Sequence, residues 1–327
     1  MSHRSGINIK KILALAIAGA VCLGASGCEQ VSSITEDNVF TIGSKSCALS
    51  DALIILLNYQ KEYDSLYGID MWEHDYGEET SLEEYIKDLA IAQLAQVYTL
   101  DVIAGEQEIE LSEDETALAA EAAAEYYSGL SEDEIEYLGI EEADAADLYE
   151  KYLLAQRVYE SIMDSVDDEV SDSEARVMKA MQIVVSDSET ADAALEEAGA
   201  DASAFESAAD SYSESSALNI NIDRTTFSDE TVEAAFALME GEVSSVIEED
   251  GQYYIFYCVS AIDEDLTDEN KVTILEQRQE DAVTSVYETY AGSLSSSFDE
   301  EEWDDVSVDS GLELSGSSFL EIYDEYF

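Results

Sequence analysis

The most informative stretch of the sequence is Phe236-Ala237-Leu238-Met239-Glu240-Gly241-Glu242-Val243-Ser244, with Gly251-Gln252-Tyr253-Tyr254-Ile255-Phe256 shortly after it. Residues 232–238 are typical of a helix, and Gly241 is a typical helix-ending residue. The apolar runs at 243–247 and 253–259 then predict two strands. These residues therefore predict a helix followed by a β-hairpin.

The segments before this hairpin extend the same unit. Residues 177–185 form a compact apolar run that predicts a strand, and the Ala-rich segments 188–200 and 204–212 predict two short helices. We expect the residues between them and the next helix to form a loop. The sequence thus predicts a β-α-α-loop-α-β-β unit of about 85 residues.

The flanking segments predict helices. Ser81 with Glu84 forms a capping box, Ser50 and Ser112 are candidate helix starts, and an apolar stripe with helical spacing begins at Leu148. A short strand is expected at 39–42, a charged helix at about 267–290, and a tail rich in Ser, Asp and Glu after it. The apolar stripes of the predicted helices indicate a core in which helix packs on helix, and exposed parts of these stripes could also hold polypeptide segments.

Composition limits the function. The chain of 327 residues has 13 Lys and Arg against 77 Asp and Glu, which excludes a nucleic-acid-binding protein because phosphate recognition needs a basic face. A hydrophobic fraction of 46% is too high for a chain that stays unfolded. There is no proline.

The first residues are typical of an export signal. Arg4, Lys10 and Lys11 precede the apolar run 12–23, and small residues follow before Cys28. The Ala-Ser-Gly-Cys sequence resembles the bacterial lipobox, which implies cleavage before Cys28, diacylation of its thiol and attachment to the outer face of a membrane. The alternative is an ordinary signal peptide with a chance cysteine.

Three segments resemble the parvulin rotamase (peptidyl-prolyl cis-trans isomerase) domain: 177–185, 236–244 and 251–256. Their position after a helical segment containing 67–72 and 153–159 resembles the foldase lipoproteins of the PrsA/SurA type. The resemblance runs from about 39 to 303. It implies an α+β fold, with a mostly helical N-terminal chaperone domain completed by a C-terminal helix and a small inserted parvulin-like α/β domain.

The domains expected from the resemblance follow the chain in order. They are a lipoprotein signal peptide at 1–27, a linker at 28–38, a helical SurA-N-like chaperone domain at 39–172, a parvulin-like domain at 173–263, a C-terminal helix that packs back on the helical domain at 264–305, and an acidic tail at 306–327.

The resemblance also implies the positions of the active site. Parvulins usually carry a histidine in the first strand, an acidic or thiol residue after the second helix, a Met and a Phe in the proline pocket, and a second histidine in the last hairpin. The matching residues are Gln182, Ser215, Phe227, Thr231, and either Tyr253 or Tyr254, depending on one residue of register. After signal removal the only histidine is His74, in the helical half. The active site is therefore expected to be degenerate, which leaves weak, lost or retained rotamase activity open.

The implied function is an extracytoplasmic, lipid-anchored foldase that assists unfolded or newly exported polypeptides. The alternative is a non-catalytic surface lipoprotein that acts as a holdase or scaffold. Neither requires a cofactor, a metal or nucleic acid, and a homodimer is compatible with both. Cys47 and Cys258 are expected to be buried free thiols, with a disulfide between them as the alternative.

Overall fold

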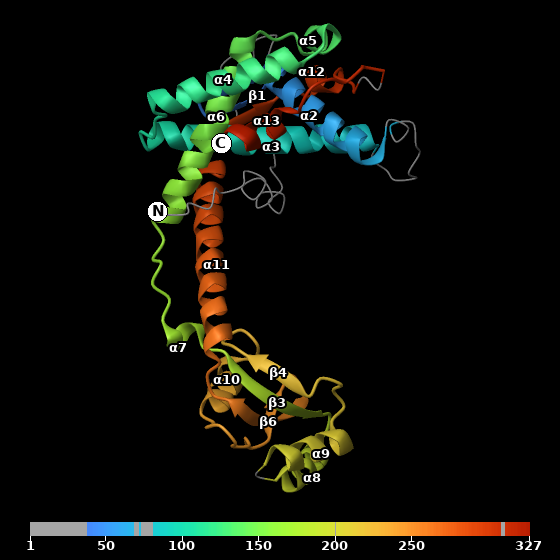
Figure 1. Cartoon of the computed structure of the whole chain (residues 1–327), viewed down its shortest axis with the longest axis vertical. Helices are drawn as coiled ribbons and strands as arrows, with labels where there is room; N and C mark the ends of the chain where they lie inside the picture. The colour runs from blue at the N-terminus through green and yellow to red at the C-terminus, as the bar shows by residue number, and fades with distance from the viewer. Residues whose placement is uncertain (1–37, 69–71, 73–80, 200, 309–310) are drawn as a thin grey trace. The chain divides into compact units, whose positions relative to one another are not determined.

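The computed structural model describes residues 38–68, 72, 81–199, 201–308 and 311–327. It divides into two compact units (Figure 1). Unit 1 comprises the described residues up to Val166 and from Glu280 onward, and unit 2 comprises Asp167–Gln279. The predicted signal segment 1–27, Cys28 and His74 lie outside the described residues.

Unit 1 is mostly helical and carries one small antiparallel sheet with the strand order β2-β1-β7. Helix α6 packs on both α3 and α4, and α2 packs on α3. The elements are β1 (Asn38–Ile42), β2 (Lys45–Ala48), α2 (Leu49–Tyr67), α3 (Leu82–Glu106), α4 (Glu113–Gly129), α5 (Glu132–Leu138), α6 (Glu142–Asp164), β7 (Ser296–Phe298), α12 (Glu300–Asp304) and α13 (Phe319–Tyr326).

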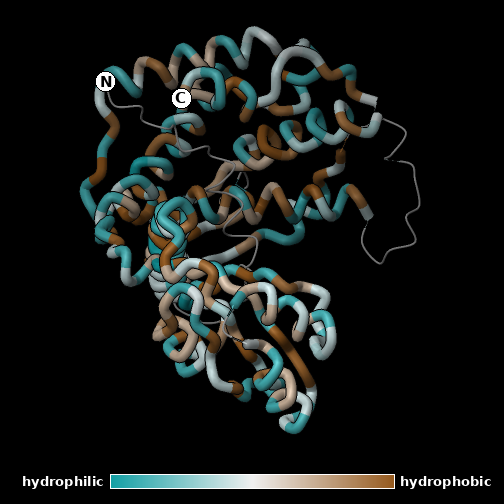
Figure 2. Tube along the Cα trace, turned by 60° about the horizontal axis from the view of Figure 1, so that its bottom comes forward, coloured by the Kyte–Doolittle hydropathy of each residue, from teal (hydrophilic) through white to brown (hydrophobic). Residues whose placement is uncertain are grey.

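Local capping explains where these helices begin. Ser81 forms the predicted capping box with Glu84, and Ser112, predicted only as a helix start, forms a second one with Glu115. In each box the serine hydroxyl accepts from the glutamate N–H and the glutamate carboxylate accepts from the serine N–H. The predicted start at Ser50 is wrong, because α2 begins at Leu49 and its N-cap residue Ala48 makes no side-chain cap. Figure 2 shows hydrophobic and hydrophilic colours alternating along the helices, which is the pattern of half-buried helices.

The last residues form more than the predicted acidic tail. Trp303 is buried, and α13 lies in the core of unit 1 with Phe319 fully buried. The Phe319 ring stacks on Tyr149 with centroids 4.0 Å apart and an interplanar angle of 9°. The apolar residues of α13 lie three and four positions apart, so they share one face of the helix although acidic residues separate them.

Unit 2 contains a four-stranded antiparallel sheet with the strand order β4-β3-β6-β5. Helix α11 (Glu264–Ala291) contributes its first residues to unit 2 and its last to unit 1, where Val283 is buried in the core. The other elements of unit 2 are α7 (Asp172–Ala175), β3 (Met178–Val185), α8 (Ser188–Ala198), α9 (Ala202–Tyr212), β4 (Asn219–Ile222), α10 (Asp229–Phe236), β5 (Ile247–Glu249) and β6 (Gln252–Ser260).

Two predictions for unit 2 are wrong. The segment expected as a loop contains β4, whose Ile222 is fully buried while Asn219 and Asn221 are exposed, the alternation of an edge strand. The strand expected at 243–247 begins only at Ile247. The Ser244 N–H donates to the Phe256 carbonyl at 2.8 Å, but the Phe256 N–H donates to the Ser244 hydroxyl at 2.9 Å, so a side chain takes the place of one main-chain acceptor there.

The turn before this irregular segment depends on Gly241. Its φ of 87° lies in the left-handed region that favours glycine. Its N–H donates to the Cys258 carbonyl at 2.8 Å, so the chain joins β6 at this turn. The helix itself ends earlier than predicted, at Phe236.

Candidate functional site

Strand register decides which side chains share each face of the unit 2 sheet. Gln182 on β3 pairs with Phe256 on β6, and Val184 pairs with Tyr254. Because side chains alternate along a strand, these four residues point to one face. Tyr253 points to the other, where it packs with the cluster of Ile183, Val185 and Ile255 under α8 and α9. The structure therefore places Tyr254, and not Tyr253, on the face of Gln182.

A cavity of about 710 Å³ opens on the face that carries Gln182. Its walls come from β3, β4, β6, the segment after α9 and the segment before α10. The lining residues are Gln182, Val184, Glu214, Ser215, Ile220, Asn221, Thr226, Phe227, Gln252 and Tyr254. Four of the six positions predicted from the parvulin resemblance thus lie together at one cavity.

An aromatic wall forms one side of this cavity. The ring of Phe227 meets Tyr254 edge to face, with centroids 5.3 Å apart and an interplanar angle of 68°, and lies 5.4 Å from Phe256. Val184 and Ile220 add aliphatic surface. An aromatic wall of this kind favours the binding of compact apolar groups such as the pyrrolidine ring of proline.

Gln182 and Ser215 meet at a single peptide group. Gln182 Nε2 donates to the Ala217 carbonyl at 2.9 Å, and Ser215 Oγ approaches the same oxygen at 3.5 Å. The Ala217 N–H in turn donates to Ser215 Oγ at 3.2 Å. These contacts fix the polar side of the cavity with an amide and a hydroxyl, neither of which changes charge near neutral pH.

Tyr254 supplies a protonated phenol. Its hydroxyl donates to Gln252 Oε1 at 3.1 Å. Burial, and then the nearby carboxylates of Glu249 and Asp250, raise the pKa of Tyr254 above its usual value. The phenol therefore remains a hydrogen-bond donor throughout the physiological pH range.

Thr231 and Tyr253 lie outside the cavity lining. Thr231 is buried in the first turn of α10 and hydrogen-bonds to Glu249. Burial alone would raise the pKa of Glu249, but hydrogen bonds from Thr231 and Ser228 outweigh it and lower that pKa. Thr231 thus joins α10 to β5, and the aromatic wall comes from Phe227 and Tyr254 instead.

Sequence reasoning missed six lining residues. Val184 could have been found from its alternation with Gln182 along the strand. Ile220 and Asn221 could be placed only once strand β4 was known, and that strand was not predicted. Glu214, Thr226 and Gln252 lie in connecting segments or at a strand end, where no local pattern marks a cavity lining. The missed residues are Val184, Glu214, Ile220, Asn221, Thr226 and Gln252.

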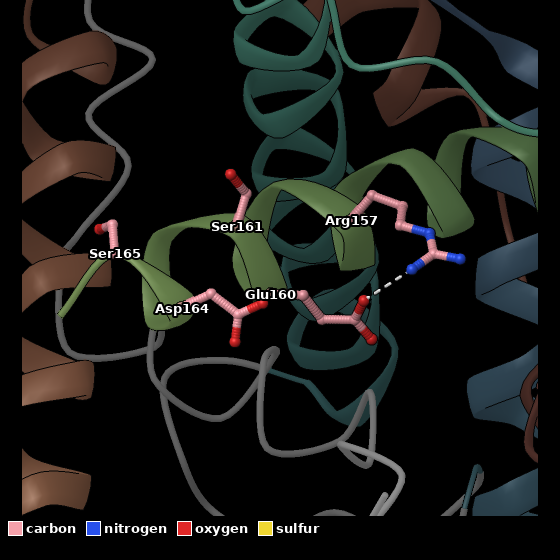
Figure 3. A pocket seen from close by; sticks show the side chains of 5 residues that line it. All are labelled: Arg157, Glu160, Ser161, Asp164 and Ser165. Atoms are coloured by element: carbon pink, nitrogen blue, oxygen red, sulfur yellow. Dashed lines mark hydrogen bonds and ion pairs between the residues drawn. The ribbon is translucent and has the colours of Figure 1, made fainter. Parts of the chain in front are cut away.

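The described residues of unit 1 show a second, smaller hollow of about 410 Å³. Figure 3 shows that its lining comes from the end of α6, with Arg157 directed toward Glu160. The Arg157 guanidinium also pairs with Glu115, so its charge is already neutralised.

The described part of the chain contains no group of three or more His, Cys, Asp or Glu side chains placed to hold a metal ion. Cys47 and Cys258 are both free and buried, without a disulfide between them. Among the same residues, no helix is long and apolar enough to cross a membrane.

Comparison with known proteins finds one family model that is similar to the region of the cavity. Residues 141–272 match the model of the PPIC-type PPIase domain. No curated protein matches the chain.

Solved structures resemble the whole chain more loosely. The foldase protein PrsA of Lactococcus lactis is 16% identical, with 88% of this chain and 98% of that chain covered and a TM-score of 0.36. The peptidylprolyl isomerase PrsA of Bacillus cereus is 16% identical, with 89% and 98% covered and a TM-score of 0.38. A SurA-like chaperone structure from Campylobacter jejuni is 9% identical, with 81% and 99% covered and a TM-score of 0.30. Since none of these scores reaches 0.5, the assignment rests on the domain match.

Proposed function

On the premise that the chain carries a PPIC-type PPIase domain, we propose that it is a foldase whose unit 2 binds proline-containing segments of client polypeptides. The observation that carries this proposal is the cavity in which Gln182, Ser215, Phe227 and Tyr254 come together. Its aromatic wall suits the proline ring, and its polar side offers hydrogen bonds to the peptide on either side of that ring.

Rotation about the prolyl bond in this cavity is proposed to be weak or lost. The barrier to rotation about an amide is about 18–20 kcal/mol, and an enzyme lowers it only through groups that interact more strongly with the twisted bond than with the planar one. Gln182 Nε2 is already engaged with the Ala217 carbonyl. The phenol of Tyr254 keeps its proton and so remains a hydrogen-bond donor. Residues 182 and 254 can therefore bind a peptide through hydrogen bonds, but neither supplies an imidazole.

Unit 1 is proposed to hold exposed apolar stretches of the same clients. Leu66 and Tyr67 at the end of α2 are 65% and 68% exposed, and Tyr85 in the first turns of α3 is 49% exposed. Tyr63 lies beside Tyr67, with ring centroids 6.0 Å apart. Exposed aromatic groups of this kind suit transient contacts with unfolded chains.

The proposed location is the outer face of a bacterial membrane. The sequence supports it through the charged start, the apolar run 12–23 and the small residues before Cys28. The strongly acidic chain would be repelled by anionic headgroups. A lipid on Cys28 would therefore provide the attachment to the membrane. The clients would then be polypeptides emerging from export.

A protease-coupled assay with an Ala-Xaa-Pro-Phe peptide tests this function. We expect little acceleration by the wild type and more by Gln182→His, because an imidazole would enter the polar side of the cavity. Suppression of client aggregation by the same wild-type preparation is expected. Strong acceleration by the wild type would overturn the weak-rotamase claim, and failure to suppress aggregation would overturn the foldase claim.

A further inference from the structure

Glu214 is the only charged side chain among the residues that line the cavity. Its own N–H donates to the Val184 carbonyl at 2.8 Å, which holds residue 214 beside β3. Its Oε1 accepts from the Ser186 N–H at 3.2 Å and from the Ser186 hydroxyl at 2.8 Å. One carboxylate oxygen is therefore fixed by Ser186, while the side chain stays exposed at the rim of the cavity.

No Lys or Arg in the described part of the chain forms an ion pair with this carboxylate. Each Lys and Arg there already contacts an acidic side chain, a main-chain carbonyl or an aromatic ring. The partners are Lys45 with Asp101, Lys61 with Glu134, Lys87 with the Val306 carbonyl and Trp303, Lys151 with Asp51, Arg157 with Glu115, Arg176 with the Ala261 carbonyl and Phe236, Lys179 with Asp263, Arg224 with Glu233, Lys271 with Asp172, and Arg278 with Glu174.

The other charges that act on the cavity have the same sign. Glu249 and Asp250 lie close enough to Tyr254 to interact electrostatically with its phenol. Neither residue lines the cavity, but Tyr254 belongs to the aromatic wall, so both carboxylates add to the negative potential at that wall. A cationic group entering the cavity would meet only attraction from these carboxylates.

We infer that Glu214 is a specificity-determining residue that selects client segments with Lys or Arg next to the proline. This inference rests on the proposed function, since it takes the proline ring to occupy the aromatic side of the cavity. The neighbouring side chain then extends toward Glu214, whose carboxylate accepts a hydrogen bond from the ammonium or guanidinium group. A glutamate at the same position of the client would be repelled.

The test measures binding rather than catalysis, so it does not depend on rotamase activity. Ala-Lys-Pro-Phe and Ala-Glu-Pro-Phe peptides are titrated into the full-length protein and their dissociation constants are compared by NMR. We expect the wild type to prefer the Lys peptide, Glu214→Gln to reduce that preference about two- to fivefold, as for an exposed ion pair, and Glu214→Lys to reverse it.

Glu196→Gln is the matched control. Glu196 is exposed on α8, is absent from the cavity lining, and its substitution changes the net charge by the same amount. We expect it to leave the preference unchanged. An equal loss of preference in Glu196→Gln and Glu214→Gln would overturn the role of Glu214 without affecting the proposed function. The same holds if neither variant loses the preference while both peptides still bind. Absence of binding of both peptides to the wild type would overturn the proposed function as well.

Discussion

Gln182 and Ser215 converge on one main-chain carbonyl, that of Ala217, at 2.9 and 3.5 Å. These two residues stand where the parvulin resemblance implies a histidine and an acidic or thiol residue. Their convergence means that the substituted side chains still form a connected polar wall. This wall can bind a peptide but has no group that titrates near neutral pH.

Tyr254 and Tyr253 are neighbours on opposite faces of the sheet, which makes them a matched pair of variants. We predict that Tyr254→Ala weakens binding of a prolyl peptide about fivefold, because it removes part of the aromatic wall. Tyr253→Ala should leave affinity nearly unchanged but lower the stability of unit 2, since Tyr253 packs under α8 and α9. Peptide titration and amide hydrogen exchange of β3 separate the two effects. Equal affinity losses would contradict the register described above.

Much of the fold follows from local sequence. The capping boxes at Ser81 and Ser112 need only residues three positions apart, so the starts of α3 and α4 could be predicted. Strand β4 could not be predicted in this way, because its four residues become a strand only by pairing with β3.

The site shows the same division between local and non-local information. Gln182, Ser215 and Phe227 were located by the resemblance, but the choice between Tyr253 and Tyr254 required the strand register. A shift of one residue reverses every side chain of a strand, and no local signal fixes that register. Glu214 was missed because its importance comes from the cavity around it and not from its sequence neighbours.

The end of the chain is predicted to stabilise unit 1. Phe319 is fully buried and stacks on Tyr149, whose hydroxyl donates to the Phe319 carbonyl at 2.9 Å. Phe319→Ala should therefore lower the free energy of unfolding by about 3–5 kcal/mol.

Tryptophan fluorescence during urea unfolding measures this effect, since Trp72 and Trp303 are the only two tryptophans and both belong to unit 1. Tyr326→Phe is the control, because its hydroxyl bonds to Glu125 at the surface. We expect that control to change stability by less than about 0.5 kcal/mol. A Phe319→Ala effect as small as the control would show that α13 is not part of the core.

A buried ion pair gives unit 1 a predicted pH dependence. Glu134 is fully buried and pairs with Lys61 at 2.9 Å, and it accepts hydrogen bonds from Ser131 and from Ser315. Burial would raise the pKa of Glu134, but these hydrogen bonds outweigh it and lower that pKa below its usual 4.5. Its contribution to stability is therefore complete above about pH 4.5 and is lost as the pH falls through the lowered folded-state pKa.

Glu134→Gln should lower the stability of unit 1 by about 3 kcal/mol at neutral pH, because Lys61 loses its buried partner. The difference from the wild type should shrink as the pH falls below 4.5. Thermal unfolding of both proteins between neutral and acidic pH measures this difference. A difference that stays constant over the whole range would contradict the ionised pair.

The acidity of the chain predicts which clients it captures. With a net charge of −64, the surface should attract basic unfolded chains and repel acidic ones. Added salt screens charges beyond about 8 Å at physiological ionic strength, so suppression of aggregation of a basic client should weaken as salt rises. Light scattering with one basic and one acidic client at low and high salt measures this. Equal, salt-independent suppression of both clients would count against it.

The cavity beside Gln182 is proposed to bind proline-containing segments. The most direct measurement of this binding is an NMR titration of the full-length protein with Ala-Lys-Pro-Phe and, in parallel, with Ala-Lys-Ala-Phe. We expect the prolyl peptide to shift the amide signals of β3, β6 and residues 213–227, and the alanyl peptide to do so much more weakly. Shifts that are absent from these residues, or equal for the two peptides, would contradict it.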